Sequence, residues 1–284
     1  MDKLYQIKGT KHLNPSDLYS SPDIYPKFQE NLEIFQHQLI EDSKSLRNNT
    51  YYKFGDGDYY LFKNIQIGTA KPGMRDLYKY NFLNPTRDYI LKNAKKNDYL
   101  STLLEFFPQF KEIFNKEPNY LAEYVYGLIA NKWFFNNFKK IGLIGSLQKI
   151  QLIKELINYQ EYKDYLGIDS FESYHSIPQK YALPKSKYLY KKLGKSINKS
   201  KAEIFLIGIG LSQNILLNKL KNFTNKPLVI VGVGIDAIAG CVNINRPYFG
   251  NWINYRIKNN LIYEEIDDIA MKTTINSENT YLLK

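Results

Sequence analysis

The sequence predicts an α/β protein: a Rossmann-like, mostly parallel sheet flanked by helices, with a helical N-terminal region. Three apolar runs that end at glycines carry this prediction, at residues 140–145, 202–210 and 227–234. Stretches with helical spacing separate them, and strand, glycine, helix and strand in this order are typical of a parallel sheet. No internal repeat or low-complexity linker divides the chain, so we expect residues 1–284 to form a single domain.

The first half of the chain begins with an irregular lead-in at residues 1–25, which is polar and interrupted by prolines. Apolar positions then recur at helical spacing over residues 27–47 and predict a helix. An aromatic strand is expected at residues 50–55. The strand-forming residues after it predict extended chain at 59–67, followed by a loop at 68–73.

Residues 74–140 have a largely helical pattern, and the clearest helix in this stretch is expected at 119–140, after a proline. The aromatic residues of that helix are typical of a core. We also expect a helix at 146–159, a strand at 172–177, a lysine-rich helix at 184–199, a strand at 202–207, a helix at 212–222, a strand at 227–231 and a C-terminal extension at 257–284.

The net charge of +11 favours an acidic partner such as a phosphorylated substrate, a membrane surface or nucleic acid. Only five of the 39 basic residues are arginine, so we interpret most of the charge as solvated lysine. The single Cys241 excludes an internal disulfide and a cysteine-based zinc site. No apolar run reaches about 18 residues, so we expect no transmembrane segment and a cytoplasmic location. A homo-oligomer is compatible with these properties.

Two aspartates, Asp56 and Asp58, follow the aromatic strand and lie beside Gly55 and Gly57. Glycine leaves the backbone free to turn, so both carboxylates can project towards one point. Converging carboxylates at the end of a strand suit Mn²⁺ or Mg²⁺ bound to a diphosphate. The pattern indicates a metal-dependent enzyme acting on a nucleotide sugar. The alternative is a hairpin turn with two solvated aspartates.

We expect a nucleotide to bind at the glycine turns that follow the later strands, because ligands bind beyond the carboxyl ends of parallel strands. Gly208, Gly210 and Ser212 form one such turn. We expect this turn and the main-chain groups near Phe54 and Gly55 to bind the nucleotide together. A tight strand-to-helix connection without a ligand is the alternative. The spacing after Gly232 fits a dinucleotide fingerprint only weakly, because proline and asparagine soon follow.

A general base and a phosphate-binding cation complete the expected site. Asp236, directly after a buried strand, is the first candidate for the base that deprotonates an acceptor hydroxyl; Glu172 and His175 are the second. Asp236 as a helix cap and His175 as a structural histidine are the alternatives. Lys180 and Arg246 are candidates for the cation, and the sequence does not choose between them.

The segment Phe54-Gly55-Asp56-Gly57-Asp58 resembles the Phe-Gly-Asp-Gly-Glu signature of GT-D-type glycosyltransferases, and the glycine turns of residues 208–236 are similar to that family's C-terminal half. The resemblance covers roughly residues 27–256. It implies a Rossmann-like fold, a nucleotide-sugar donor that is usually a UDP-sugar, and a divalent ion held by Asp56 and Asp58. This chain has Asp58 where the family usually has glutamate.

Together these features predict a glycosyltransferase of the hexosyltransferase type, which transfers a sugar to a hydroxyl-bearing acceptor such as a glycan or a glycoprotein. Two other classes stay open. A Rossmann-like enzyme using NAD or S-adenosylmethionine would need no divalent ion. A basic nucleic-acid-binding protein would associate with DNA or RNA in a salt-sensitive way, although the sequence contains no recognisable nucleic-acid-binding motif.

Overall fold

A single parallel sheet organises the protein in the computed structural model, which describes residues 28–65, 86–178 and 186–242. Its seven strands follow the order β3-β2-β1-β7-β6-β4-β5, which confirms the predicted α/β class. The strands are β1 (Thr50–Phe54), β2 (Tyr99–Thr102), β3 (Tyr120–Leu121), β4 (Ile141–Ser146), β5 (Ser173–Ile177), β6 (Ile204–Gly208) and β7 (Leu228–Ile230). The predicted lead-in, the 68–73 loop and the C-terminal extension lie outside the described residues.

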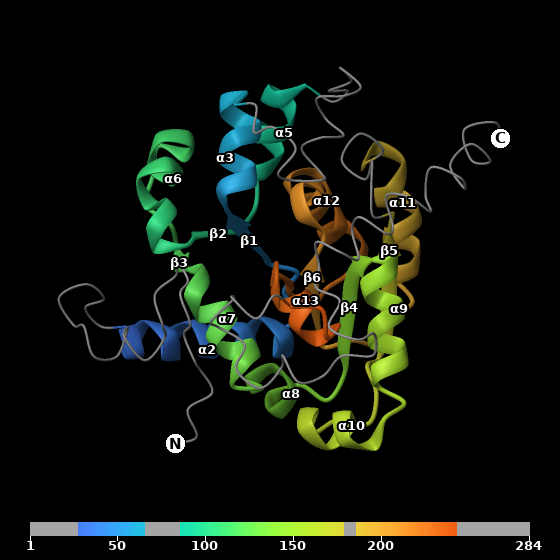
Figure 1. The fold of residues 1–284 in the computed structure, drawn as a ribbon. Helices are drawn as coiled ribbons and strands as arrows, with labels where there is room; N and C mark the ends of the chain where they lie inside the picture. The colour runs from blue at the N-terminus through green and yellow to red at the C-terminus, as the bar shows by residue number, and fades with distance from the viewer. Residues whose placement is uncertain (1–27, 66–85, 179–185, 243–284) are drawn as a thin grey trace.

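Helices cover both faces of the sheet (Figure 1). On the face of Tyr52 and Phe54 lie α3 (Asp56–Lys63), α5 (Arg87–Ala94), α6 (Phe107–Phe114), α11 (Ser186–Ile197) and α12 (Gln213–Leu220). On the face of Tyr51 lie α2 (Phe28–Lys44), α7 (Ala122–Ala130), α8 (Trp133–Asn137), α9 (Leu147–Leu156), α10 (Gln160–Leu166) and α13 (Gly234–Ile238). Short 3₁₀ turns complete the connections: η1 (Leu104–Phe106), η2 (Gly210–Ser212) and η3 (Lys221–Phe223).

The central strands β6 and β7 are apolar because both of their faces are buried. Along β6, Phe205 and Ile207 pack into the core cluster under α12, whereas Leu206 packs into the cluster on the opposite face. Successive side chains of a strand point to opposite faces, so a strand covered on both sides has no polar positions. This property explains why the strands predicted at 140–145, 202–207 and 227–231 are confirmed, each within two or three residues. The strand predicted at 172–177 is also confirmed, as the edge strand β5, which has polar positions.

The prediction of extended chain at 59–67 is wrong for its described part, because α3 begins at Asp56 and continues to Lys63. Gly55 is the N-cap in an extended conformation, and its N–H donates to the side chain of Asp58. This half of a capping box, together with two acids in the first turn, starts a helix. The cap therefore outweighs the strand preference of the aromatic residues that follow.

The single helix predicted at 119–140 is also wrong. Tyr120 and Leu121 form β3, α7 ends at Ala130, and Lys132 adopts a left-handed conformation (φ 58°) before the short α8. A left-handed residue cannot continue a right-handed helix, so the chain turns there. The largely helical pattern of 74–140 also concealed the strand β2, which pairs with β1.

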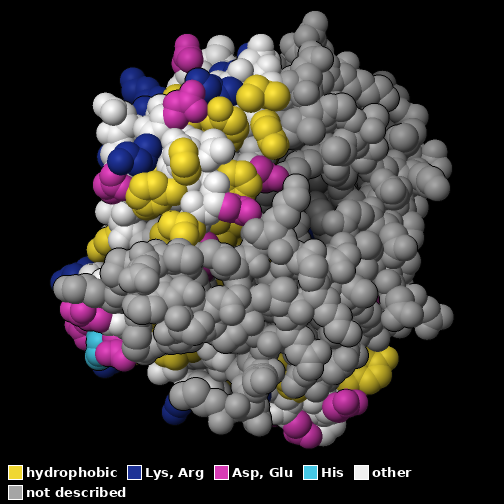
Figure 2. Space-filling model, turned by 60° about the vertical axis from the view of Figure 1, so that its left-hand side comes forward, with side chains coloured by type: hydrophobic (Ala, Val, Ile, Leu, Met, Phe, Trp, Pro, Cys, Tyr) yellow, Lys and Arg dark blue, Asp and Glu magenta, His cyan; other side chains and the backbone are white. Residues whose placement is uncertain are grey.

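The described surface carries charges of both signs. On the described part of the face in Figure 2, Lys and Arg side chains lie next to Asp, Glu and hydrophobic side chains. The basic charge is therefore not gathered into one uniform patch on that part of the face. None of the described helices combines the length and the apolar composition needed to cross a membrane.

Candidate functional site

The neighbouring strands β1 and β7 define a topological switch point at the carboxyl edge of the sheet. They pair in parallel, with Thr50 opposite Leu228. The helix after β1, α3, packs beside α5 and α6, whereas the residues of α13 after β7 belong to the core cluster of the opposite face. Open α/β sheets bind ligands where successive helices diverge to opposite faces in this way.

The turn from Phe54 to Asp58 lies at this switch point. Phe54 is fully buried, with its ring 5.7 Å from the ring of Phe110 and edge-on to it, so the end of β1 is held firmly. A Cβ atom at Gly57 would lie 3.4 Å from the side chain of Leu211 in η2. The structure thus brings the aspartate turn next to the predicted turn of Gly208, Gly210 and Ser212.

Asp58 is held by the protein itself. Its side chain is 4% exposed and accepts hydrogen bonds from Gly55 N–H (2.9 Å), Asn214 Nδ2 (2.6 Å) and Gln213 Nε2 (3.2 Å). Burial raises the pKa of Asp58, while these bonds and the charge of Lys53 oppose that rise. A cation at this carboxylate would meet amide N–H donors. Asp58 therefore fits an anchor between α3 and α12 better than a metal ligand.

Asp56 is the more accessible aspartate of the pair. Its side chain is partly exposed, and Oδ1 accepts a hydrogen bond from Gly57 N–H (2.7 Å). Mg²⁺ is commonly held by one or two carboxylates together with substrate phosphates and water, so one accessible carboxylate beside a phosphate site suffices. The described residues contain no cluster of three or more His, Cys, Asp or Glu side chains that could bind a metal by itself.

Lys53 is a site residue that the sequence reasoning missed. It is half-buried on β1, with Nζ 5.6 Å from the ring centre of Tyr126, and a Cβ atom at Gly55 would lie 3.3 Å from that ammonium. No carboxylate among the described residues forms an ion pair with Lys53. The available signal was its position, because a lysine interrupts an otherwise aromatic strand directly before the turn.

The turn after β7 lies against Lys53. Gly232 has a left-handed backbone (φ 52°), Val233 a right-handed one (φ −66°, ψ −8°), and a Cβ atom at Gly232 would lie 3.6 Å from Lys53 Cδ. Neither residue's N–H has a hydrogen-bond acceptor within the part of the chain that the structure describes. Successive N–H groups in such a left-handed and right-handed pair can form an anion-binding concavity. Together with the ammonium, this turn can bind a phosphate group.

Glu123 is a second residue that the sequence reasoning missed. It lies in the first turn of α7, is 3% exposed, and Oε1 accepts a hydrogen bond from Leu104 N–H (2.9 Å). Oε2 is buried and has no hydrogen-bond partner among the described residues, a situation that costs about 1–3 kcal/mol. Burial raises the pKa of Glu123 to about 7, although the N–H of Leu104 and the charge of Lys53 oppose that rise.

The structure places Asp236 in an ion pair. Its Oδ1 lies 2.5 Å from Lys149 Nζ of α9, and both side chains are buried. The ammonium of Lys149 compensates the buried charge of Asp236. An acid whose charge is held by a neighbouring ammonium is a poor base for a substrate hydroxyl.

Glu172 and His175 lie away from the switch point. Glu172 precedes β5 at the amino edge of the sheet, where Oε1 accepts a hydrogen bond from Lys201 N–H (3.1 Å). His175 is buried within β5 between the hydroxyls of Ser196 (2.8 Å) and Ser173 (3.0 Å), and burial lowers its pKa to about 4. Lys180 and Arg246 lie outside the described residues.

The glycines of the β6 turn have different roles. A Cβ atom at Gly208 would lie 2.3 Å from Ile235 Cγ2 and 3.0 Å from the carbonyl oxygen of Gly232, so this glycine permits close packing of β6 against α13. Gly210 is exposed with a left-handed backbone (φ 51°), and no atom would contact a Cβ placed there. Ser212 is buried at the end of η2. Gly210 is therefore the member of this turn that is accessible to a ligand.

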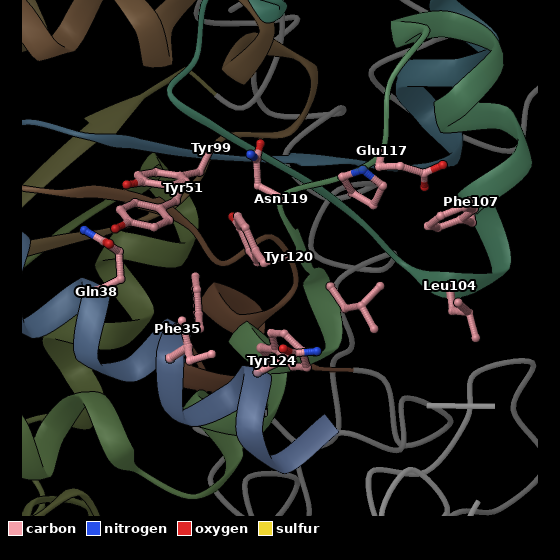
Figure 3. A pocket seen from close by; sticks show the side chains of 14 residues that line it. Phe35, Gln38, Tyr51, Tyr99, Leu104, Phe107, Glu117, Asn119, Tyr120 and Tyr124 are labelled. Carbon is pink, nitrogen blue, oxygen red and sulfur yellow. The ribbon is translucent and has the colours of Figure 1, made fainter. Parts of the chain in front are cut away.

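An aromatic groove of about 570 Å³ runs between α2 and the β2–β3 edge (Figure 3). Its rings include Phe35 and Tyr120, which stack with centroids 4.5 Å apart, and Tyr99, which stacks on Tyr51. Leu104 lies towards the other end of the groove. The groove does not contain the switch point. Leu104, which lines the groove, donates its N–H to Glu123.

The protein has an α/β fold, and its candidate ligand-binding position lies at the carboxyl edge of the parallel sheet. No protein family matches the sequence, and no curated protein matches it. Among solved structures, a similar one is that of "a new glycosyltransferase (DUF1792)" from Streptococcus sanguinis. The two chains are 12% identical with a TM-score of 0.46, and the match covers 71% of this chain and 81% of the other.

Proposed function

We propose that the protein is a glycosyltransferase that moves a hexose from a nucleotide-sugar donor, a UDP-sugar, to a hydroxyl-bearing acceptor. The observation that carries the proposal is the ammonium of Lys53. It lies at the switch point, half-buried, without an ion pair among the described residues, and beside a turn whose N–H groups are available. A buried cation favours an anionic partner, and a diphosphate supplies one.

The donor diphosphate would bind between the two turns. Lys53 Nζ and the N–H groups of Gly232 and Val233 would contact its oxygens, with the main chain of Gly55 and Gly210 beside the nucleotide. The resemblance of Phe54–Asp58 to the GT-D signature supports a nucleotide sugar over other diphosphates. Lys53 would stabilise the negative charge that develops on the leaving nucleoside diphosphate.

Asp56 would hold the divalent ion, Mn²⁺ or Mg²⁺, against the same diphosphate. Such an ion neutralises charge on the leaving group and orients it. Asp58 would keep the turn in shape through its bonds to Asn214, Gln213 and Gly55, so that Asp56 projects towards the donor. In this arrangement the two aspartates do different work, one binding and one positioning.

The test is a thermal-shift titration with UDP and UDP-hexoses, with and without Mn²⁺. Lys53→Met keeps an unbranched chain against Tyr126 but removes the charge, so we expect UDP to bind about 10–100-fold more weakly. Lys154→Met is the matched control, since Lys154 also lies over an aromatic ring, with Nζ 5.2 Å from the ring centre of Tyr174, but on α9. We expect this control to bind UDP as the wild type does.

Three outcomes would contradict the proposal. Equal UDP affinity in the wild type and in Lys53→Met would remove Lys53 from the donor site. Stabilisation by NAD or S-adenosylmethionine, independent of Mn²⁺, would favour the other nucleotide-dependent class. Salt-sensitive association with DNA or RNA, without any effect of UDP, would favour nucleic-acid binding. Release of UDP from a UDP-hexose on addition of a glycan acceptor would support the proposal directly.

A further inference from the structure

We infer that Glu123 is the catalytic base of the transfer: its Oε2 takes the proton of the acceptor hydroxyl while that hydroxyl attacks the donor sugar. This inference rests on the proposed function and assigns a role that we initially expected for Asp236. The base would come from α7, directly after β3, and would act across the switch point from the aspartate turn.

The backbone of Leu104 and that of Glu123 itself act on the Glu123 carboxylate. Oε1 accepts the N–H of Leu104, which fixes the side chain. Oε2 is buried and has no hydrogen-bond partner in the described ranges. A hydroxyl donor arriving at Oε2 would give this buried oxygen its missing hydrogen bond. Asp58, in contrast, accepts hydrogen bonds at both of its oxygens.

Two charged groups act on Glu123 from the elements around it, and both suit a base. Lys53 of β1 favours the ionised carboxylate, and Glu105 of η1 disfavours it, but burial dominates. The resulting pKa of about 7 lies close to neutral pH, where a general base is both sufficiently ionised and sufficiently basic. His175, with its pKa lowered to about 4, is buried between two serine hydroxyls and faces neither Lys53 nor the aspartate turn.

Glu123 is next in sequence to residues of the aromatic groove, and its carboxylate is within reach of the charge of Lys53. Leu121 and Tyr124 line the aromatic groove, as does Leu104, whose N–H binds the carboxylate of Glu123. The acceptor would therefore bind in this groove. Aromatic side chains with amide groups such as those of Gln38 and Asn119 suit a carbohydrate acceptor.

The proposed step is a single displacement. The acceptor oxygen forms a bond to the anomeric carbon, and its proton moves to Glu123 Oε2. The bond between that carbon and the diphosphate oxygen breaks, and the electron pair leaves with the nucleoside diphosphate, next to Lys53. Deprotonation of Glu123 by water restores the enzyme. Attack opposite to the leaving group inverts the configuration at the anomeric carbon.

The experiment compares full-length wild type with Glu123→Gln, which keeps the acceptor oxygen for Leu104 N–H but cannot take a proton. We expect kcat for transfer from a UDP-hexose to fall about 10²–10⁴-fold, with UDP affinity unchanged. In the wild type, kcat/KM should rise as the pH passes about 7, because Glu123 loses its proton there. The variant should lack this rise of kcat/KM with pH. Glu155→Gln, a change at an exposed acid on α9, is the control and should retain both the rate and its pH dependence.

A second readout needs no substrate. Because the folded protein holds a proton on Glu123 more tightly than the unfolded chain, the wild type should lose stability relative to Glu123→Gln as the pH rises from 5 to 8. We expect the difference between the two melting temperatures to change by several degrees. Parallel melting curves, or a variant with full transfer activity, would overturn the inference. Failure of UDP to bind the wild type would instead overturn the proposed function, and the inference with it.

Discussion

Ionisable groups in the interior of two regions of the molecule have different partners. Beside β4, Lys149 and Asp236 form a buried ion pair, and His175 is held between two hydroxyls. Beside β1, the ammonium of Lys53 pairs with no described carboxylate, and Glu123 leaves one oxygen without a described partner. A charge that is satisfied within the chain is explained by folding. A charge that is not satisfied points to a ligand.

The largest expected effect comes from breaking the satisfied pair. Lys149→Met leaves the carboxylate of Asp236 buried without its cation, so we expect the free energy of unfolding to fall by about 3–5 kcal/mol. Denaturant unfolding measures the loss. The double variant Lys149→Met/Asp236→Leu should regain most of it, because an apolar pair replaces the ions. Lys149→Met should bind UDP normally under conditions in which it is folded. Loss of UDP binding there would show that Asp236 belongs to the site, and would contradict the contrast between the two regions.

The next effect separates the two aspartates of the turn. Asp58→Asn removes the charge that accepts hydrogen bonds from Gly55 and Asn214 and places an amide N–H₂ among donors, which should cost about 3 kcal/mol of stability. Asp56→Asn, a change of the same size on a partly exposed residue, should cost less than about 1 kcal/mol. Asp56→Asn should instead remove the part of UDP binding that depends on Mn²⁺. The reverse pattern in melting and titration would make Asp58 the ligand.

A smaller effect concerns His175 and acid. Because burial lowers its pKa to about 4, the unfolded chain takes up a proton below about pH 6.5 while the folded chain does not. The protein should therefore lose about 2 kcal/mol of stability from this residue between pH 7.5 and pH 5. His175→Gln should show a shallower loss in melting experiments over that range. An equal slope in both proteins would show that His175 does not remain neutral inside the sheet.

The sequence predicted the central sheet well because burial on both faces produces an unambiguous pattern. Ile141–Ser146 and Ile204–Gly208 are buried at every position, and their apolar runs end at glycines. It failed at α3, where Tyr59 and Tyr60 favour a strand but the cap at Gly55 starts a helix. Local preference and capping conflicted there, and composition alone does not reveal which one dominates.

The candidate site was only partly predictable. The turn at Asp56 and Asp58 and the turn at Gly210 were found in the sequence, and the structure places them together. Lys53 and Glu123 were missed because each has meaning only when β1, η1 and α7 converge, and no spacing in the chain records that convergence. Asp236 was given a catalytic role because its partner Lys149 comes from a distant helix. Pairings of this kind become visible only in three dimensions.

The place of β7 in the sheet has a consequence for assembly on the ribosome. Within the described residues, β1, β2 and β3 form one strand group and β4, β5 and β6 another, and β7 alone joins them by pairing with β1 and β6. A nascent chain that ends before residue 228 can therefore form both groups but cannot merge them. The last described strand to be synthesised completes the sheet, and the binding position between β1 and β7 comes into existence only at that moment.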